Sequence, residues 1–437
     1  MTKSSVFSIR GGMRFIYLIC APLLVGCGKL EMPPEVFDEE VFLEVSDPLS
    51  FNYEYRDTVM SNDVLERAYQ MATLMWTPVN PIPMTGGGFY SQGKVVTGVP
   101  YSSVKEINTY LFQDVSYHTF MTAVHNPKSV LYTENISQDP YHGKNCAPYY
   151  GSVCSSSVMY ALGIDIPYYA NQIIKLPFME KLEYQVVDSL RICDVIWKSG
   201  HVQMVYNIEH RADSLYRISM FESSGKSAHI TKYTREQFIK MWKSGKYVGY
   251  RYLNLRYSDE PTEFRELDPI AYNDDLCPSK GDKSVYRTTD TVTVNIFNPT
   301  YNKIVLTNVA RSAEVFEDIK GENHQYYDLP PGVYFVHLQG EENRSAEVSF
   351  EIVETNVSYS NADSDDQLRI FFHSSAEPVY ATLCDNVGGS LFYFRITPDD
   401  WDRGYIVVPR SIKSEYYCKI VFKGEYGRII NEPIRVK

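Results

Sequence analysis

Hydrophobic positions in the first half of the chain recur in two different patterns. Asn62 to Trp76 and Thr234 to Trp242 place apolar residues three and four positions apart, which is typical of helices that pack on one side. Val202 to Ile208 instead alternates its side chains between two faces, as a half-buried strand does. This mixture predicts an α+β domain over residues 49–268.

From about residue 283 the pattern changes to short alternating runs separated by turn residues. Such runs predict two β-sandwiches, residues 279–356 and 357–437, which meet near Ser358 to Asp366. The strand-like runs are Thr291 to Phe297, Lys303 to Asn308, Val333 to Leu338, Ala346 to Val353, Gln367 to Phe372, Val379 to Leu383, Phe392 to Thr397, Gly404 to Pro409 and Tyr416 to Phe422.

Leu329-Pro330-Pro331-Gly332 forms a turn signal before Val333-Tyr334. The whole run resembles the penultimate hairpin of small immunoglobulin-like sandwiches in bacterial surface proteins, which implies an immunoglobulin-like fold for these domains. Because few contacts cross a domain boundary, we expect residues 46–272 and 279–437 each to fold independently.

The N-terminus carries an export pattern. Lys3, Arg10 and Arg14 precede the apolar run Phe15 to Val25, which has the length of a signal peptide and is too short to span a membrane. The run ends in Leu24-Val25-Gly26-Cys27, which resembles the lipobox of bacterial lipoproteins. The alternative is an ordinary secretory signal with a chance cysteine.

The lipobox implies a signal peptide at residues 1–27, lipidation of Cys27 and attachment to a bilayer in the cell envelope, on the periplasmic or surface face of the outer membrane. Residues 28–48 contain Pro33-Pro34 and Asp38-Glu39-Glu40 and are predicted to be a tether. The formal charge of −12, with scattered Lys and Arg, argues against a nucleic-acid partner.

Cysteine spacing argues against a structural zinc site. Cys20 and Cys27 belong to the signal, and Cys384 and Cys418 could pair in an oxidising compartment. The remaining cysteines, Cys146, Cys154, Cys193 and Cys277, show no C-x-x-C spacing. No metal or other cofactor is therefore expected.

Cys154 is the strongest candidate for a working thiol. Gly151 and Ser152 open the segment, and Val158 and Leu162 follow Cys154 at a spacing of four, which predicts a helix that begins near Cys154. Unpaired amides and the helix dipole at such a position favour the thiolate, the form that attacks carbonyl groups. The alternative is a small buried cysteine on a packed helix.

His201 is the candidate base. It opens the alternating strand and shares a face with Gln203, after the turn at Ser199-Gly200. An imidazole beside a thiol at a helix start could activate the thiol and then protonate the leaving amine. A lone histidine in this position could equally be a solvated edge residue.

Together these motifs resemble the NlpC-type and CHAP-type papain-like cysteine peptidases, which are cell-wall amidases. The resemblance rests on Cys154 at a helix start, on Asp194-Val195 followed by Gly200-His201-Val202, and on the Gly98-Val99-Pro100-Tyr101 run, and it covers about residues 95 to 255. It implies a papain-like domain that acts on peptidoglycan peptides.

These families use a third polar residue to orient the imidazole. Glu222 resembles the acidic residue of the CHAP type and is our choice, although strand parity puts Ser223 on the side of His201. Only a one-residue bulge would bring Glu222 round. His229 is a weaker candidate.

The chain also departs from the family pattern. NlpC-type enzymes usually have Asp-Cys-Ser, in which the Asp helps to hold the substrate's amine, whereas this chain has Val153-Cys154-Ser155. Ser155 matches, and Tyr101 or Tyr150 could supply the cleft tyrosine. The long segment between Tyr101 and Cys154 contains His118, His125 and His142, whose spacing fits no familiar metal site.

Two functions therefore remain. The first is a membrane-anchored cysteine peptidase or amidase that cleaves cell-wall stem peptides with Cys154 as nucleophile, His201 as base and Glu222 as orienting residue. The second is an inactive papain-like scaffold with immunoglobulin-like domains that binds glycan or a protein partner at the cell envelope. The retained Cys154 and His201 favour the first, and the missing Asp favours the second.

Overall fold

The computed structural model describes residues 58–84, 88–101, 114–133, 150–166, 168–183, 185–211, 214–260, 262, 264–310, 313–361, 367–384, 390–409, 416–432 and 434–436. The predicted signal peptide, Cys27, the tether, His142 and Cys146 lie outside these residues. Among the described helices, none has the length and apolar character that a membrane crossing requires.

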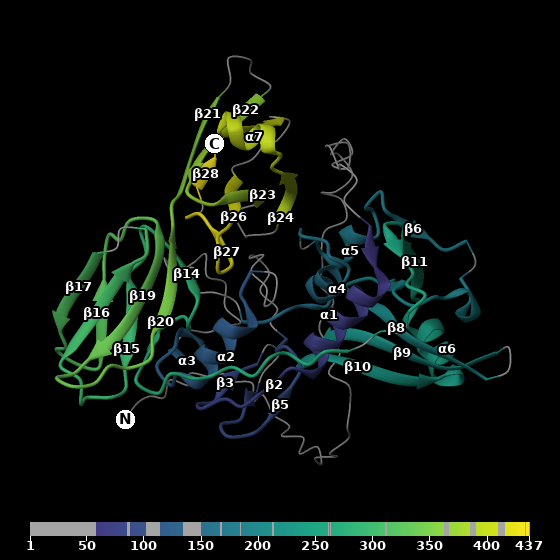
Figure 1. Ribbon diagram of the computed structural model, residues 1–437. Helices are drawn as coiled ribbons and strands as arrows, with labels where there is room; N and C mark the ends of the chain where they lie inside the picture. Colours follow the sequence, from purple (N-terminus) through teal and green to yellow (C-terminus); the bar gives the residue numbers. More distant parts are fainter. Residues whose placement is uncertain are drawn as a thin grey trace, which may run out of the picture. The chain divides into compact units, whose positions relative to one another are not determined.

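A six-stranded antiparallel sheet forms the centre of the first region, in the order β10-β9-β8-β7-β11-β6 (Figure 1). Its strands are β6 (Met179–Lys181), β7 (Val195–Lys198), β8 (His201–Arg211), β9 (Ser214–Ser224), β10 (Ser227–Thr234) and β11 (Val248–Tyr252). The predicted strand Val202 to Ile208 is confirmed as part of β8.

Helices cover both faces of this sheet. α1 (Ser61–Thr73) and α4 (Cys154–Ala161) pack on each other and share a core with the face that carries Val202 and Met204. α6 (Arg235–Gly245) covers the opposite face, where Phe238 and Trp242 are buried. This helix confirms the predicted one, and Thr234 caps it by accepting a hydrogen bond from Gln237 N at 3.3 Å.

Shorter elements complete this region. The predicted helix Asn62 to Trp76 ends at Thr73, and Trp76 lies in a strand instead. The remaining elements are β1 (Val59–Met60) beside β12 (Leu255–Arg256), β2 (Met75–Trp76) beside β5 (Val96–Thr97), β3 (Ile82–Pro83) beside β4 (Phe89–Tyr90), α2 (Tyr117–His125), α3 (Val130–Thr133), α5 (Ala170–Ile173) and a 3₁₀ turn at Val187–Ser189.

The third quarter of the chain is an all-β sandwich with one shared core. One sheet has the order β13-β15-β18 and the other β14-β20-β19-β16-β17. The strands are β13 (Leu276–Pro278), β14 (Ser284–Arg287), β15 (Val292–Ile296), β16 (Lys303–Asn308), β17 (Ala313–Asp318), β18 (Asn323–Tyr326), β19 (Gly332–Gln339) and β20 (Val348–Val353).

A second sandwich follows directly. One sheet has the order β21-β22-β25, and the other has the order β24-β23-β26-β27 with β28 beside β26. Its elements are β21 (Thr355–Asn361), β22 (Gln367–Ser374), β23 (Glu377–Cys384), β24 (Ser390–Arg395), α7 (Pro398–Arg403), β25 (Tyr405–Pro409), β26 (Tyr416–Lys423), β27 (Arg428–Ile430) and β28 (Ile434–Val436).

Two predicted details of the sandwiches differ. They meet at Glu354, between β20 and β21, rather than near Ser358 to Asp366. The first sandwich also begins earlier than residue 279, because Leu276 of β13 is completely buried in its core. In β23 and β26 the register pairs Cys418 with Leu383, so Cys418 and Cys384 leave the strand pair on opposite faces.

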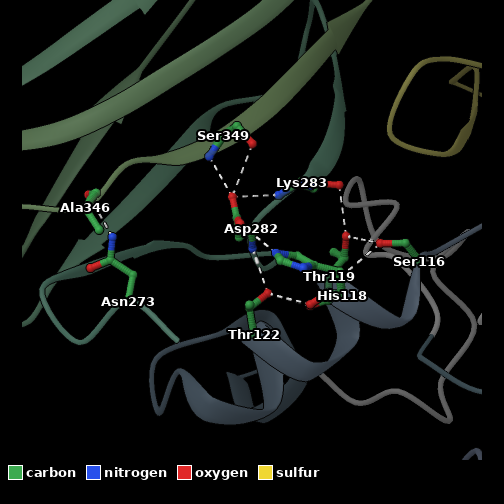
Figure 2. A network of polar contacts seen from close by, with 9 residues as sticks. All are labelled: Ser116, His118, Thr119, Thr122, Asn273, Asp282, Lys283, Ala346 and Ser349. Carbon is green, nitrogen blue, oxygen red and sulfur yellow. Dashed lines mark hydrogen bonds and ion pairs between the residues drawn. The ribbon is translucent and has the colours of Figure 1, made fainter. Parts of the chain in front are cut away.

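Asp282 joins the first sandwich to α2 (Figure 2). Its Oδ1 accepts hydrogen bonds from the backbone N–H groups of Ser349 at 2.6 Å and Lys283 at 3.0 Å. Its Oδ2 lies 2.7 Å from His118 Nε2, and its own N–H donates to Thr122 Oγ1 at 2.9 Å. One residue thereby ties a helix of the first region to β20 and to the segment that leads into β14.

Arg428 joins β27 of the second sandwich to the same region. Its Nη1 donates to the Asp165 carbonyl at 2.9 Å and lies 3.6 Å from Asp114 Oδ1. The side chains of Arg428 and Asp114 are both buried. Three apolar residues of this sandwich, Tyr380, Val421 and Ile430, also belong to the core that contains α1 and α4.

Candidate functional site

Cys154 is the first residue of α4, as the sequence predicts. The turn before it is closed by the Val153 N–H, which donates to Ser156 Oγ at 2.9 Å. Val158 and Met159 are completely buried, so the helix is held firmly against the sheet. The first amides of a helix have no intrahelical acceptor, and they give the Cys154 sulfur a positive electrostatic environment.

His201 begins β8 and lies close enough to Cys154 for the thiol to raise the pKa of the imidazole. Its side chain is largely buried. Burial alone would lower the pKa of His201, but the hydrogen bonds to Cys154 and Glu222 outweigh burial and raise this pKa to about 9. His201 is therefore an imidazolium at neutral pH, which is the partner that a thiolate needs.

Glu222 on β9 holds the other side of His201. The distance between Glu222 Oε2 and His201 Nε2 is 2.9 Å. Burial would raise the pKa of Glu222, but its hydrogen bonds to His201 and His229 and their positive charges hold this pKa well below its usual range. The carboxylate is therefore ionised and compensates the imidazolium.

A β-bulge explains how Glu222 reaches His201. The register pairs Met204 with Phe221, but after Val205 it shifts by one residue, so that Asn207 pairs with Ser219. The extra residue is Tyr206, and a second shift between Glu209 and His210, where Tyr216 of β9 is left out of the pairing, offsets it toward the turn. The expectation that a one-residue bulge would be needed to turn Glu222 toward His201 is confirmed.

Ser223 and His229, the other two candidates for the third position, have different contacts. Ser223 Oγ donates to the Ser152 carbonyl at 3.0 Å and so fixes the segment that leads into α4. His229 lies directly opposite Glu222 in the sheet, and its Nε2 is 3.5 Å from Glu222 Oε1. Of the three, Glu222 is the one whose hydrogen bond to His201 the structure records.

Gln203 is a member of the site that the sequence analysis did not select. Its Nε2 donates to Glu222 Oε2 at 2.9 Å and lies 3.2 Å from His201 Nε2. The side chain is buried. Gln203 lies two residues after His201 on the same face of the strand, and this position is the feature of the sequence that could have identified it as part of the site.

Tyr101, Tyr150 and Ser155, the predicted substrate-binding residues, are all buried. The Tyr150 hydroxyl donates to the Lys280 carbonyl at 2.6 Å, in the segment that enters the first sandwich. The Tyr101 N–H donates to the Lys226 carbonyl at 2.9 Å. The hydrogen bonds of Tyr101 and Tyr150 are structural contacts, and the role of all three residues toward substrate stays a prediction.

The Gly98-Val99-Pro100-Tyr101 run lies along the start of β10. Ala228 N donates to the Val99 carbonyl at 2.8 Å, and Pro100 forms a bridge with Ser227. Gly98 has φ +89°, and a Cβ there would lie 2.0 Å from the Ala228 carbonyl oxygen. Only glycine fits this close approach, which accounts for the first residue of the motif.

Two of the histidines between Tyr101 and Cys154, His118 and His125, contact aspartates at or near the first sandwich. His118 pairs with Asp282, and His125 Nε2 lies 3.1 Å from Asp274 Oδ1. Within the described ranges, no cluster of three or more His, Cys, Asp or Glu residues could hold a metal ion.

Comparison with known proteins gives no family for the chain. No model of a protein family matches it, and no curated protein matches it either. Solved structures with some similarity include a two-domain fibronectin type-III segment of chicken tenascin (11% identity, 38% of this chain and 97% of the other, TM-score 0.23). The fibronectin(III)-like modules of CbhA from Clostridium thermocellum are similar at 9% identity, over 37% of this chain and 91% of the other, with a TM-score of 0.19.

A third similar structure is native alpha-2-macroglobulin from Escherichia coli spanning domains NIE-MG1 (9% identity, 36% of this chain and 95% of the other, TM-score 0.17). The description of residues 276–436 as two β-sandwiches rests on their own strand pairing and cores.

Proposed function

We propose that the first region is a papain-like cysteine peptidase or amidase. The observation that carries the proposal is the Cys154–His201–Glu222 arrangement. It consists of a thiol at a helix start, an imidazole that interacts with the thiol, and a carboxylate hydrogen-bonded to the imidazole. Thiol acyl transfer needs these three groups in this order.

The chemistry follows from the charges. The Cys154 thiolate would attack the carbonyl carbon of the peptide bond, and the backbone N–H of Cys154, at the open end of α4, would bind the oxyanion. The His201 imidazolium would give its proton to the leaving amine, which leaves a thioester on Cys154. His201 would then accept a proton from water as the water attacks the thioester, which releases the acid and restores the thiolate.

The substrate class comes from the resemblance to NlpC-type and CHAP-type enzymes. We propose stem peptides of peptidoglycan as substrate. Glu222, Gln203 and His229 would keep the His201 ring oriented toward Cys154. No metal or organic cofactor takes part in this mechanism.

Alkylation of Cys154 by iodoacetamide at about pH 6 tests the activated thiol. Cys154 should react well ahead of Cys193 and Cys277, because burial raises the pKa of Cys193 to about 12 and also raises that of Cys277. His201→Ala should slow the reaction of Cys154, since its imidazolium partner is removed. Equal rates for the three thiols in the folded wild type would contradict the proposal.

Attachment to a membrane through Cys27 is a separate proposal, which rests on the Leu24-Val25-Gly26-Cys27 sequence. Cys27→Ser should abolish labelling by a fatty-acid analogue and release the protein in soluble form, whereas Cys20→Ser should leave both unchanged. If Cys27→Ser protein remains labelled and sediments with membranes, the lipobox assignment is wrong.

A further inference from the structure

The carboxylate of Glu222 is surrounded by hydrogen-bond donors from two neighbouring strands. On β8, His201 Nε2 and Gln203 Nε2 both lie 2.9 Å from Oε2. On β10, His229 Nε2 lies 3.5 Å from Oε1. Both oxygens of the carboxylate therefore have an imidazole beside them.

The surroundings of His229 determine its protonation. Its Nδ1 lies 2.8 Å from the Ser227 carbonyl oxygen, which can only accept a hydrogen bond, so Nδ1 must carry a proton. Its Nε2 faces an ionised carboxylate, which also can only accept. Beside this anion a proton on Nε2 is favoured as well, and a ring with protons on both nitrogens is the imidazolium cation.

Neighbouring charges support this assignment. The hydrogen bond to Glu222 is the largest influence on His229 and raises its pKa above the ordinary histidine value, while burial and the positive charge of His201 act in the opposite direction. Burial and, after it, the negative charge of Glu222 raise the pKa of Tyr233 and of Tyr247, so both tyrosines stay neutral. Glu222 is thus the anion that both imidazolium rings share.

This arrangement gives His201 a fixed orientation. Its Nε2 is used on Glu222, which leaves Nδ1 for the Cys154 sulfur. If Glu222 turned away, the ring of His201 would lose the contact that fixes it. Gln203 and His229 are the groups that oppose such a rotation, one on each carboxylate oxygen.

We propose that His229 is a positioning residue: as an imidazolium it holds Glu222 against His201, and the reactivity of Cys154 falls when His229 loses its proton. The importance of this role for catalysis rests on the proposed function. The protonation of His229 and the reactivity of Cys154 can be measured whether or not the chain is a peptidase. His229 itself does not touch the thiol or a substrate in this account.

The first measurement is the protonation of His229 in the full chain, read from ¹⁵N-imidazole chemical shifts by NMR. At about pH 7 both nitrogens of His229 should be protonated in the wild type, and the ring should be neutral in Glu222→Gln, because its anionic partner is gone. A neutral His229 ring in the wild type at this pH would overturn the proposal.

The second measurement is the rate of Cys154 alkylation as a function of pH. At about pH 7, His229→Gln should react about tenfold more slowly than wild type, the equivalent of one charge-assisted hydrogen bond of about 1.4 kcal/mol. The ratio of the two rates should fall toward one as the pH rises through the titration of His229. His229→Lys, which keeps a cation to a higher pH, should restore the wild-type rate.

The matched control is His373→Gln. His373 also faces a glutamate, with its Nε2 3.4 Å from Glu354 Oε2, but His373 is exposed on β22 of the second sandwich. The control should react like wild type. If His229→Gln does so as well at every pH, His229 has no positioning role. If the NMR and alkylation results hold but no peptide is cleaved, the positioning role stands and the peptidase proposal fails.

Discussion

Cys154→Ala is expected to reduce amine release from peptidoglycan stem peptides to background, a loss on the order of 10⁶-fold. The nucleophile forms the bond through which the reaction passes, so the other residues of the site cannot replace it. Glu222→Gln should retain about 100-fold more activity than Cys154→Ala, because an orienting residue contributes less than the nucleophile. The measurement is the rate of new primary amines in a cell-wall digest.

The control for this experiment is Cys277→Ala. Cys277 is a buried thiol of the first sandwich, outside the candidate site, and its loss should leave turnover unchanged. If Cys154→Ala and wild type release amines equally from every stem peptide, the chain is a binding scaffold and the alternative function holds.

The pieces 46–272 and 279–437 are expected to be unstable when separated, in contrast to the expectation from the sequence pattern. Residues 279–437 lack β13, whose Leu276 is completely buried in the core of the first sandwich. Deleting a buried leucine side chain alone costs about 2–5 kcal/mol, and here a whole strand is lost. The other piece loses the Lys280 carbonyl, which accepts the hydrogen bond of the buried Tyr150.

The buried contacts of Arg428 add to this effect. Separation removes Arg428 from Asp114 and Asp165, and breaking a buried ion pair by removing one partner costs about 3–5 kcal/mol. Circular dichroism during thermal unfolding should show a cooperative transition for residues 46–437 and none for either piece. Two pieces that each unfold cooperatively, with stabilities close to that of the whole, would show that the shared contacts contribute little.

The sequence predicts much of the site because its signals are local. Cys154 follows from a helical spacing of four and a glycine-serine start, and His201 follows from an alternating strand after a Ser-Gly turn. The choice of Glu222 could not be made from strand parity, because parity assumes regular pairing and the bulge at Tyr206 breaks it.

Gln203 was missed for a related reason. A glutamine in an alternating strand has the same pattern whether it faces water or a buried carboxylate, and only the packing of β9 beside β8 distinguishes the two. The sequence gives little indication that the first sandwich begins before residue 279. β13 (Leu276–Pro278) is a short strand, and its pairing with Val294–Ile296 is what identifies it.

The pairing of β8 with β9 makes the site depend on the number of residues between His201 and Glu222. Tyr206 of β8 and Tyr216 of β9 are both left out of the pairing, so Met204 pairs with Phe221 in the same register in which Arg211 pairs with Ser214. A one-residue change in the length of either strand that moved Met204 out of register with Phe221 by one position would instead turn the Glu222 side chain to the surface of the sheet opposite His201. The site could thus be disconnected by a change in chain length alone, with every one of its chemical groups still present.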